Sequence, residues 1–153
     1  MKKTSICVLL GLLVSLPALA DGPLVRFDGG IGVQPVRAGG GANTVQGVNP
    51  GGIPWVIARL TADVKTDGRI SVDGRGLLLA GGNGIGTNGG QSVRARLFCG
   101  TVASDTVLVP LQPNGDFRID DVLSPLPANP CNTPVLLIIN TGGAWFAAGI
   151  PNN

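Results

Sequence analysis

The sequence predicts an all-β fold, a single domain of about eight strands arranged as a β-sandwich (immunoglobulin-like or jelly-roll) or as a partly open barrel. Three observations lead to this prediction. Apolar and polar residues alternate with a period of two along several segments, which is the pattern of a strand with one buried face. Turn signals separate these segments at fairly even spacing, in a chain with 25 Gly and 12 Pro. No segment shows the 3.6-residue periodicity of an amphipathic helix.

The longest alternating stretch is 55–80, WVIARLTADVKTDGRISVDGRGLLLA, which predicts a hairpin of two long strands. The even positions of 56–64 are apolar, and the odd positions from Arg59 onward are polar. Asp67-Gly68 supplies residues that adopt the positive φ of a tight turn. With this phase, Trp55 is expected on the otherwise polar face of the first strand.

The remaining elements follow from the same signals, in chain order. A short strand at 23–27 opens the domain. The Gly-rich segment 28–54 is interpreted mainly as a connecting loop, in which 31–33 could pair as an edge strand. Alternation or continuous apolar character predicts the later strands, and proline predicts a stiff crossover. The strands are expected at 91–99, 106–111, 117–122, 135–139 and 144–150, with a hairpin turn at Asn114-Gly115 and the crossover at 124–130.

The start of the chain, 1–20, has the three parts of a secretory signal peptide. Met1-Lys2-Lys3 is positive, 6–16 is a short apolar run, and the segment ends in Ala-Leu-Ala. The apolar run is too short to cross a bilayer core of about 30 Å. We therefore expect cleavage after Ala20, a single β-domain at 21–153 in the periplasm or outside the cell, and no membrane span.

Removal of this leader makes the chain neutral. Residues 21–153 carry nine basic and nine acidic side chains, whereas the whole sequence has a formal net charge of +2. The balance therefore gives no reason to expect nucleic acid as a partner.

Two cysteines remain beyond residue 20, Cys99 and Cys131. In an exported chain such a pair is most simply a disulfide. The alternative, free thiols or a metal pair, is disfavoured because the chain has no His and no third Cys in this region. We expect no metal ion and no cofactor.

Several motifs suggest catalysis or ligand binding, but each has a simpler interpretation. The segment 84–89 matches GxGxxG, yet the residues after it alternate with a period of two, whereas a dinucleotide site needs a helix there. Oxygen-rich groups at Asp63, Asp67 and Asp73 or within 114–121 could hold calcium, but they also suit turns and solvated strands. Without His, the usual Ser–His and Cys–His nucleophiles are excluded. We expect no catalytic residues and no enzymatic activity.

Two residues are the candidate ligand contacts: Trp55 and Arg59, both expected on the polar face of the long hairpin. Trp145 lies beside Phe146 in an apolar strand and is expected to cap the core. The leading hypothesis is a non-enzymatic exported module with an interaction or structural role, whose partner would be a protein or glycan of the cell envelope. The alternative is a module that binds a glycan or a small apolar molecule through Trp55 and the Gly-rich loops. A third hypothesis is self-assembly through uncapped edge strands.

Four motifs together resemble a group of small exported bacterial β-rich proteins of uncharacterised function. They are Asp67-Gly68-Arg69-Ile70, the segment 76–82 (GLLLAGG), Leu97-Phe98-Cys99 and the segment 145–151 (WFAAGIP). The resemblance implies an exported β-domain. It implies no activity and no functional residues.

Overall fold

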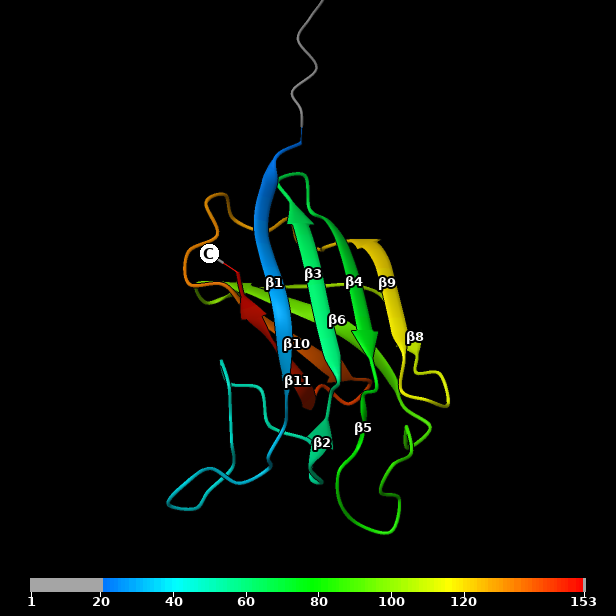
Figure 1. The fold of residues 1–153 in the computed structure, drawn as a ribbon. Helices are drawn as coiled ribbons and strands as arrows, with labels where there is room; N and C mark the ends of the chain where they lie inside the picture. Colours follow the sequence, from blue (N-terminus) through cyan, green and yellow to red (C-terminus); the bar gives the residue numbers. More distant parts are fainter. Residues whose placement is uncertain (1–20, 153) are drawn as a thin grey trace, which may run out of the picture.

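The computed structural model describes residues 21–152, and within that range the secondary structure is entirely β (Figure 1). The predicted signal peptide, 1–20, lies outside the described residues. The strands are β1 (Pro23–Gly32), β2 (Trp55–Val56), β3 (Arg59–Lys65), β4 (Arg69–Arg75), β5 (Leu78–Leu79), β6 (Ser92–Cys99), β7 (Val102–Asp105), β8 (Val109–Pro110), β9 (Phe117–Val122), β10 (Val135–Asn140) and β11 (Trp145–Pro151). Within the same residues, no helix has the length and apolar character needed to cross a membrane.

The main sheet is antiparallel and runs in the order β7-β6-β10-β11-β1-β3-β4-β9, with β8 also paired to β6. Figure 1 shows this sheet folded over itself, with β1, β3, β4 and β9 in one layer and β6, β10 and β11 crossing behind them. The core lies between the layers. The predicted all-β class is therefore confirmed, in the form of the partly open barrel: one continuous half-barrel sheet.

The two ends of this sheet approach each other at one point. Asp105 of β7 and Ser124, just after β9, exchange two backbone hydrogen bonds of 2.9 and 3.0 Å. The edge strands are thus joined to each other there rather than left open.

The central hairpin forms as predicted. β3 pairs with β4 in a register that places Ala62 opposite Val72, and Gly68 occupies the turn with φ +86°. The inward side chains Leu60, Ala62 and Val64 are buried, so the period of two is confirmed along β3.

Before β3 the predicted alternation of buried and exposed side chains is wrong. The chain leaves the sheet at 57–58, and the preceding residues form β2, which pairs with β5 in a separate two-stranded sheet. Val56 is therefore exposed and Trp55 buried, the reverse of the expectation. The cause is a non-local contact: Trp55 N–H donates to the carbonyl of Val33, which anchors β2 beside the end of β1.

β1 is longer than the predicted 23–27. Its second half pairs with β11, so Ile31 and Gly32 lie inside the sheet rather than in a loop or at an edge. Gly32 allows this because a Cβ there would collide with the backbone of Trp55 and Val56. The Gly-rich loop accordingly begins after β1.

Of the hairpin predicted around Asn114-Gly115, only the turn itself and the bridge between Asp105 and Ser124 form. The turn closes through Gln112 N–H to the carbonyl of Asp116, 2.9 Å. Between the turn and the Asp105–Ser124 bridge, however, β8 pairs with β6 and not with β9.

The predicted disulfide is present. Cys99 and Cys131 are bonded with their Cα atoms 4.7 Å apart, linking the end of β6 to the segment that leads into β10. β10, which the sequence predicts as a strand buried on both faces, has four consecutive residues with no exposed surface, Leu136 to Ile139.

Candidate functional site

The structure brings Trp55 and the Gly-rich loops together at one end of the half-barrel. The loop that follows β1, the small sheet of β2 and β5, and the loop that follows β5 lie side by side at this end, at the bottom of Figure 1. A depression of about 270 Å³ lies among these segments, and we call it the loop-end depression. Its lining consists of Gly51, Gly52, Ile53, Trp55, Leu79, Gly89, Gln91, Asn140, Ala144 and Phe146.

Trp55 forms the aromatic part of this lining together with Phe146. The two rings are stacked, with centroids 4.1 Å apart and planes inclined by 14°. Only 3% of Trp55 is exposed. Gly51 and Gly89 lie against the ring edges, since a Cβ at either would come within 3.5 Å of the indole. The prediction that Trp55 lies on an open polar face is therefore wrong, and stacking of a ligand on its ring would compete with Phe146.

The polar groups of the loop-end depression are amides and one indole N–H. Asn140 Oδ1 accepts a hydrogen bond of 2.9 Å from the backbone N–H of Ala144, while Asn140 Nδ2 donates to no residue within 21–152. Gln91 Nε2 donates a long bond of 3.3 Å to the carbonyl of Gly89. Trp55 Nε1 is not among the buried polar atoms that lack a partner in the described part of the chain, which are Asp63 Oδ1 and Arg94 Nε. No side chain in the lining is charged.

Exposed aliphatic side chains belong to the segments around the depression. Ile53, Val56 and Ile85 are 42%, 48% and 65% exposed. Ile53 contacts the loop after β5, because a Cβ at Gly82 would lie 3.6 Å from its Cδ1. An exposed apolar surface beside a recess is typical of an interaction site.

Arg59, the second sequence candidate, lies elsewhere. It lines a depression of about 390 Å³ on the outer face of β1, β3 and β4, together with Asp28 and Thr61. Trp55 does not contribute to that depression, so the two candidates are not brought together. Arg59 stands directly opposite Arg75 in the β3–β4 register.

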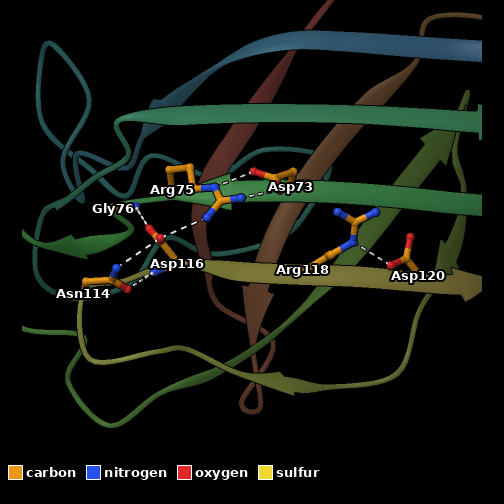
Figure 2. Close-up of polar contacts among 7 residues, drawn as sticks. All are labelled: Asp73, Arg75, Gly76, Asn114, Asp116, Arg118 and Asp120. Carbon is orange, nitrogen blue, oxygen red and sulfur yellow. Dashed lines mark hydrogen bonds and ion pairs between the residues drawn. The ribbon is translucent and has the colours of Figure 1, made fainter.

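Two carboxylates on this side of the molecule are already paired with Arg75. Asp73 binds Arg75 through two contacts of 2.7 and 2.8 Å, and Asp116 binds it at 3.1 Å (Figure 2). The pKa of Asp116 is held below its usual value, first by the backbone N–H of Gly76 and then by Arg75 and Asn114. Arg59 makes no ion pair with any described residue, in contrast to Arg75.

The same pairing extends along the outer face. Arg118 and Asp120 are 2.8 Å apart (Figure 2), and the pKa of Asp120 is lowered by Arg118 and then by Ser71. A neighbouring depression of about 420 Å³ is larger than the loop-end one. Its lining includes Asp63, which binds Lys65 at 3.0 Å. We consider these two outer depressions weaker candidates because most of the charges that line them already have partners.

No metal centre emerges from the described part of the chain, where no three His, Cys, Asp or Glu side chains are grouped to hold an ion. The oxygen-rich groups considered for calcium are engaged differently. Asp67 binds Arg69 at 2.6 Å, and Asp116 binds both Arg75 and the backbone of Gly76.

Sequence reasoning missed Asn140 and Gln91 as parts of the site, and it assigned Phe146 only to the core. The turn at 141–143 is rich in glycine and signals a hairpin, but nothing local relates it to Trp55, which is about ninety residues away.

Comparison with protein-family models, with curated proteins and with solved structures finds no match to this chain. Any functional assignment therefore depends on the site itself.

Proposed function

We propose that this chain is an exported, non-enzymatic interaction module, and that its contact surface is the loop end of the half-barrel. One observation carries the proposal. An uncharged recess lies among segments that also carry Ile53, Val56 and Ile85, whose aliphatic side chains are largely exposed. Water-exposed apolar groups of this kind gain free energy when a partner covers them, at roughly 25 cal/mol per Å².

The recess is small, and its size is compatible with one anchoring side chain of a macromolecular partner. Small-molecule sites usually have volumes of roughly 300–1,000 Å³. The loop-end depression, at about 270 Å³, lies just below this range. It suits a single anchoring side chain, which is how protein interfaces use their pockets.

The alternative function, binding of a glycan or a small apolar molecule, is supported by a specific observation. Trp55 and amide groups from Gln91 and Asn140 line the same recess. It ranks second because a sugar that stacked on Trp55 would have to displace Phe146 from the ring face. A shift in tryptophan fluorescence across a panel of glycans would favour it.

Self-assembly through open sheet edges ranks third. The Asp105–Ser124 bridge ties the two edge strands to each other, which removes part of the free backbone that a second copy would need. Light scattering that showed stable oligomers of the purified protein would restore this function.

The proposal can be tested by site-specific photo-cross-linking in the cells that make the protein. A benzoylphenylalanine in place of Ile85 should give a discrete cross-linked product. The matched control is Val102, an aliphatic residue 53% exposed at the start of β7. Equal yields at both positions, or no product from position 85, would contradict the proposed surface. Hydrolytic turnover by the purified protein that was abolished by a single Asp substitution would refute the non-enzymatic part.

A further inference from the structure

Asparagine is followed directly by glycine at three places in the chain: Asn83-Gly84, Asn88-Gly89 and Asn114-Gly115. In such a pair the backbone nitrogen of the glycine can attack the side-chain amide carbon of the asparagine, because glycine has no Cβ to hinder ring closure. The reaction needs an asparagine amide that is able to turn toward the backbone and a glycine N–H that is not held in a hydrogen bond. The three pairs differ in how far they meet these requirements.

Asn88 is held at both ends of its side-chain amide. Its Nδ2 donates to the carbonyls of Leu111 and Gln112 at 3.1 and 3.0 Å. Its Oδ1 accepts the N–H of Gly90 at 2.9 Å. These bonds would have to break before the amide could turn toward Gly89.

At the third pair, both the asparagine amide and the glycine nitrogen are held. Asn114 Oδ1 accepts the N–H of Asp116 at 3.0 Å, and Asn114 Nδ2 donates to Asp116 Oδ2 at 3.1 Å. The N–H of Gly115, which would supply the attacking nitrogen, donates to the carbonyl of Gln112 at 2.8 Å. Gly115 also lies so close to Leu77 that a Cβ would overlap the backbone there. Ring closure would therefore require the whole turn to open locally.

Asn83-Gly84 lies in the loop that follows β5 (Figure 1) and lacks these restraints. Asn83 is exposed, and no hydrogen bond within residues 21–152 involves its side-chain amide or the N–H of Gly84. The turn around the pair is closed by a long bond of 3.3 Å from the N–H of Ile85 to the carbonyl of Gly82. Thr87 holds only the carbonyl of Gly84, which takes no part in ring closure.

We propose that Asn83 is a site of spontaneous deamidation in the folded protein, and that the fold protects Asn88 and Asn114. The nitrogen of Gly84 loses its proton and bonds to Asn83 Cγ, and Nδ2 leaves as ammonia, which gives a cyclic succinimide. Water then adds to either ring carbonyl and one C–N bond breaks, leaving aspartate or isoaspartate at position 83. The net reaction exchanges ammonia for water, so it requires no oxidant, reductant or enzyme.

The product carries a negative charge in the same turn as Ile85, which is 65% exposed and belongs to the proposed contact surface. This consequence of the modification rests on the proposed function. An apolar partner surface disfavours an uncompensated charge. Asn83→Asp, which reproduces one product, should therefore lower the photo-cross-linking yield from position 85.

The experiment incubates the purified folded protein at mildly alkaline pH and follows the three sites by mass spectrometry. Trypsin yields one peptide, 76–94, that contains both Asn83 and Asn88. Fragment ions therefore compare the two sites within one molecule, with Asn88 as the internal control. Asn83 should be converted at least about tenfold faster than Asn88 or Asn114, because each of these must first lose hydrogen bonds.

Unfolding and two variants are the controls. In urea with a reductant the protecting hydrogen bonds are lost, so the three sites should react at similar rates. Asn83→Gln should abolish conversion at position 83 and leave the other two sites unchanged, because the longer side chain closes a ring much less readily. Gly84→Ala adds a Cβ beside the attacking nitrogen and should slow the reaction at Asn83 several-fold in the folded and the unfolded protein.

The proposal is overturned if Asn88 or Asn114 is converted as fast as Asn83 in the folded protein, or if Asn83 reacts only after unfolding. Its failure can be separated from that of the proposed function, because the mass data do not depend on a partner. Absence of cross-linking from position 85 in the unaltered protein would count against the contact surface alone. Equal cross-linking by Asn83→Asp and by the unaltered protein would overturn the effect of the charge on that surface.

Discussion

Loss of the disulfide should remove a large part of the stability of this domain. The bonded cysteines are 32 positions apart in the sequence. In the chain-entropy model, a cross-link that closes a loop of this length lowers the entropy of the unfolded chain enough to stabilise the fold by about 3.7 kcal/mol. A domain of this size has a total unfolding free energy of roughly 5–15 kcal/mol, so the single bond contributes a substantial share. With an unfolding entropy of about 0.28 kcal/mol/K for the domain, its loss should lower Tm by about 13 °C.

The assay is urea unfolding of three samples: the oxidised protein, the reduced protein and the double variant Cys99→Ala/Cys131→Ala. The reduced protein keeps both sulfur atoms, so it isolates the loss of the cross-link. The double variant adds the small void left by Cys99, whose side chain is buried, and it should be the least stable. The slope m should rise in both samples, because an unfolded chain without the cross-link exposes more surface. A reduced protein within about 1 kcal/mol of the oxidised one, with an unchanged slope, would refute the loop-entropy argument.

Three further predictions concern the sheet, the ion pairs and the partner. Gly74→Ala should destabilise the protein by about 1–3 kcal/mol in urea unfolding, because the added Cβ would clash with the ring of Phe117 on the neighbouring strand. An unchanged stability would mean that the ring can move aside. Asp116→Asn should lower stability at neutral pH but not at low pH. The reason is that the N–H of Gly76, with Arg75, depresses the pKa of the Asp116 carboxyl in the folded protein below 3.8. The stabilisation from Asp116 is therefore complete above that pH and is lost as the pH falls through the lower folded pKa. A difference in stability from the unaltered protein that persisted at pH 2 would contradict this. Association with the partner should proceed at an unsteered rate of about 10⁵–10⁶ M⁻¹s⁻¹ that hardly changes between 50 and 500 mM salt, because the lining of the loop-end depression is uncharged. A steep salt dependence in stopped-flow measurements would place the contact on the charged outer face instead.

Much of the fold could be predicted because its signals are local. The alternation along β3, the Asp67-Gly68 turn and the continuous apolar run of β10 each specify a conformation within a few residues. The cysteine pair could be predicted because an expected export signal, with no His and no third Cys beyond residue 20, leaves few alternatives to a disulfide.

The candidate site could not be predicted in the same way, because non-local contacts decide it. Alternation alone places Trp55 in one strand with Arg59. In the structure, a hydrogen bond to Val33 and a ring stack on Phe146 pull it into β2, and the chain bends before β3. Burying a large aromatic ring gains more free energy than burying the valine beside it. Trp55 is therefore buried and Val56 exposed, against the alternation of the sequence. The sequence pattern gives no measure of this competition.

Existing ion pairs explain why the outer face is the weaker candidate site, although it is more polar and has the larger depressions. Exposed ion pairs such as Arg118–Asp120 are screened by solvent and add little to stability, so they do little to hold the sheet together. Their larger effect is on recognition. A charged ligand on this face would have to replace contacts that Arg75 already makes with Asp73 and Asp116. At the loop end the situation is different, because the lining of the depression carries no charged side chain, so a partner would not have to replace an ion pair there. Recognition by this domain should therefore depend on shape and apolar contact, with hydrogen bonds fixing the orientation.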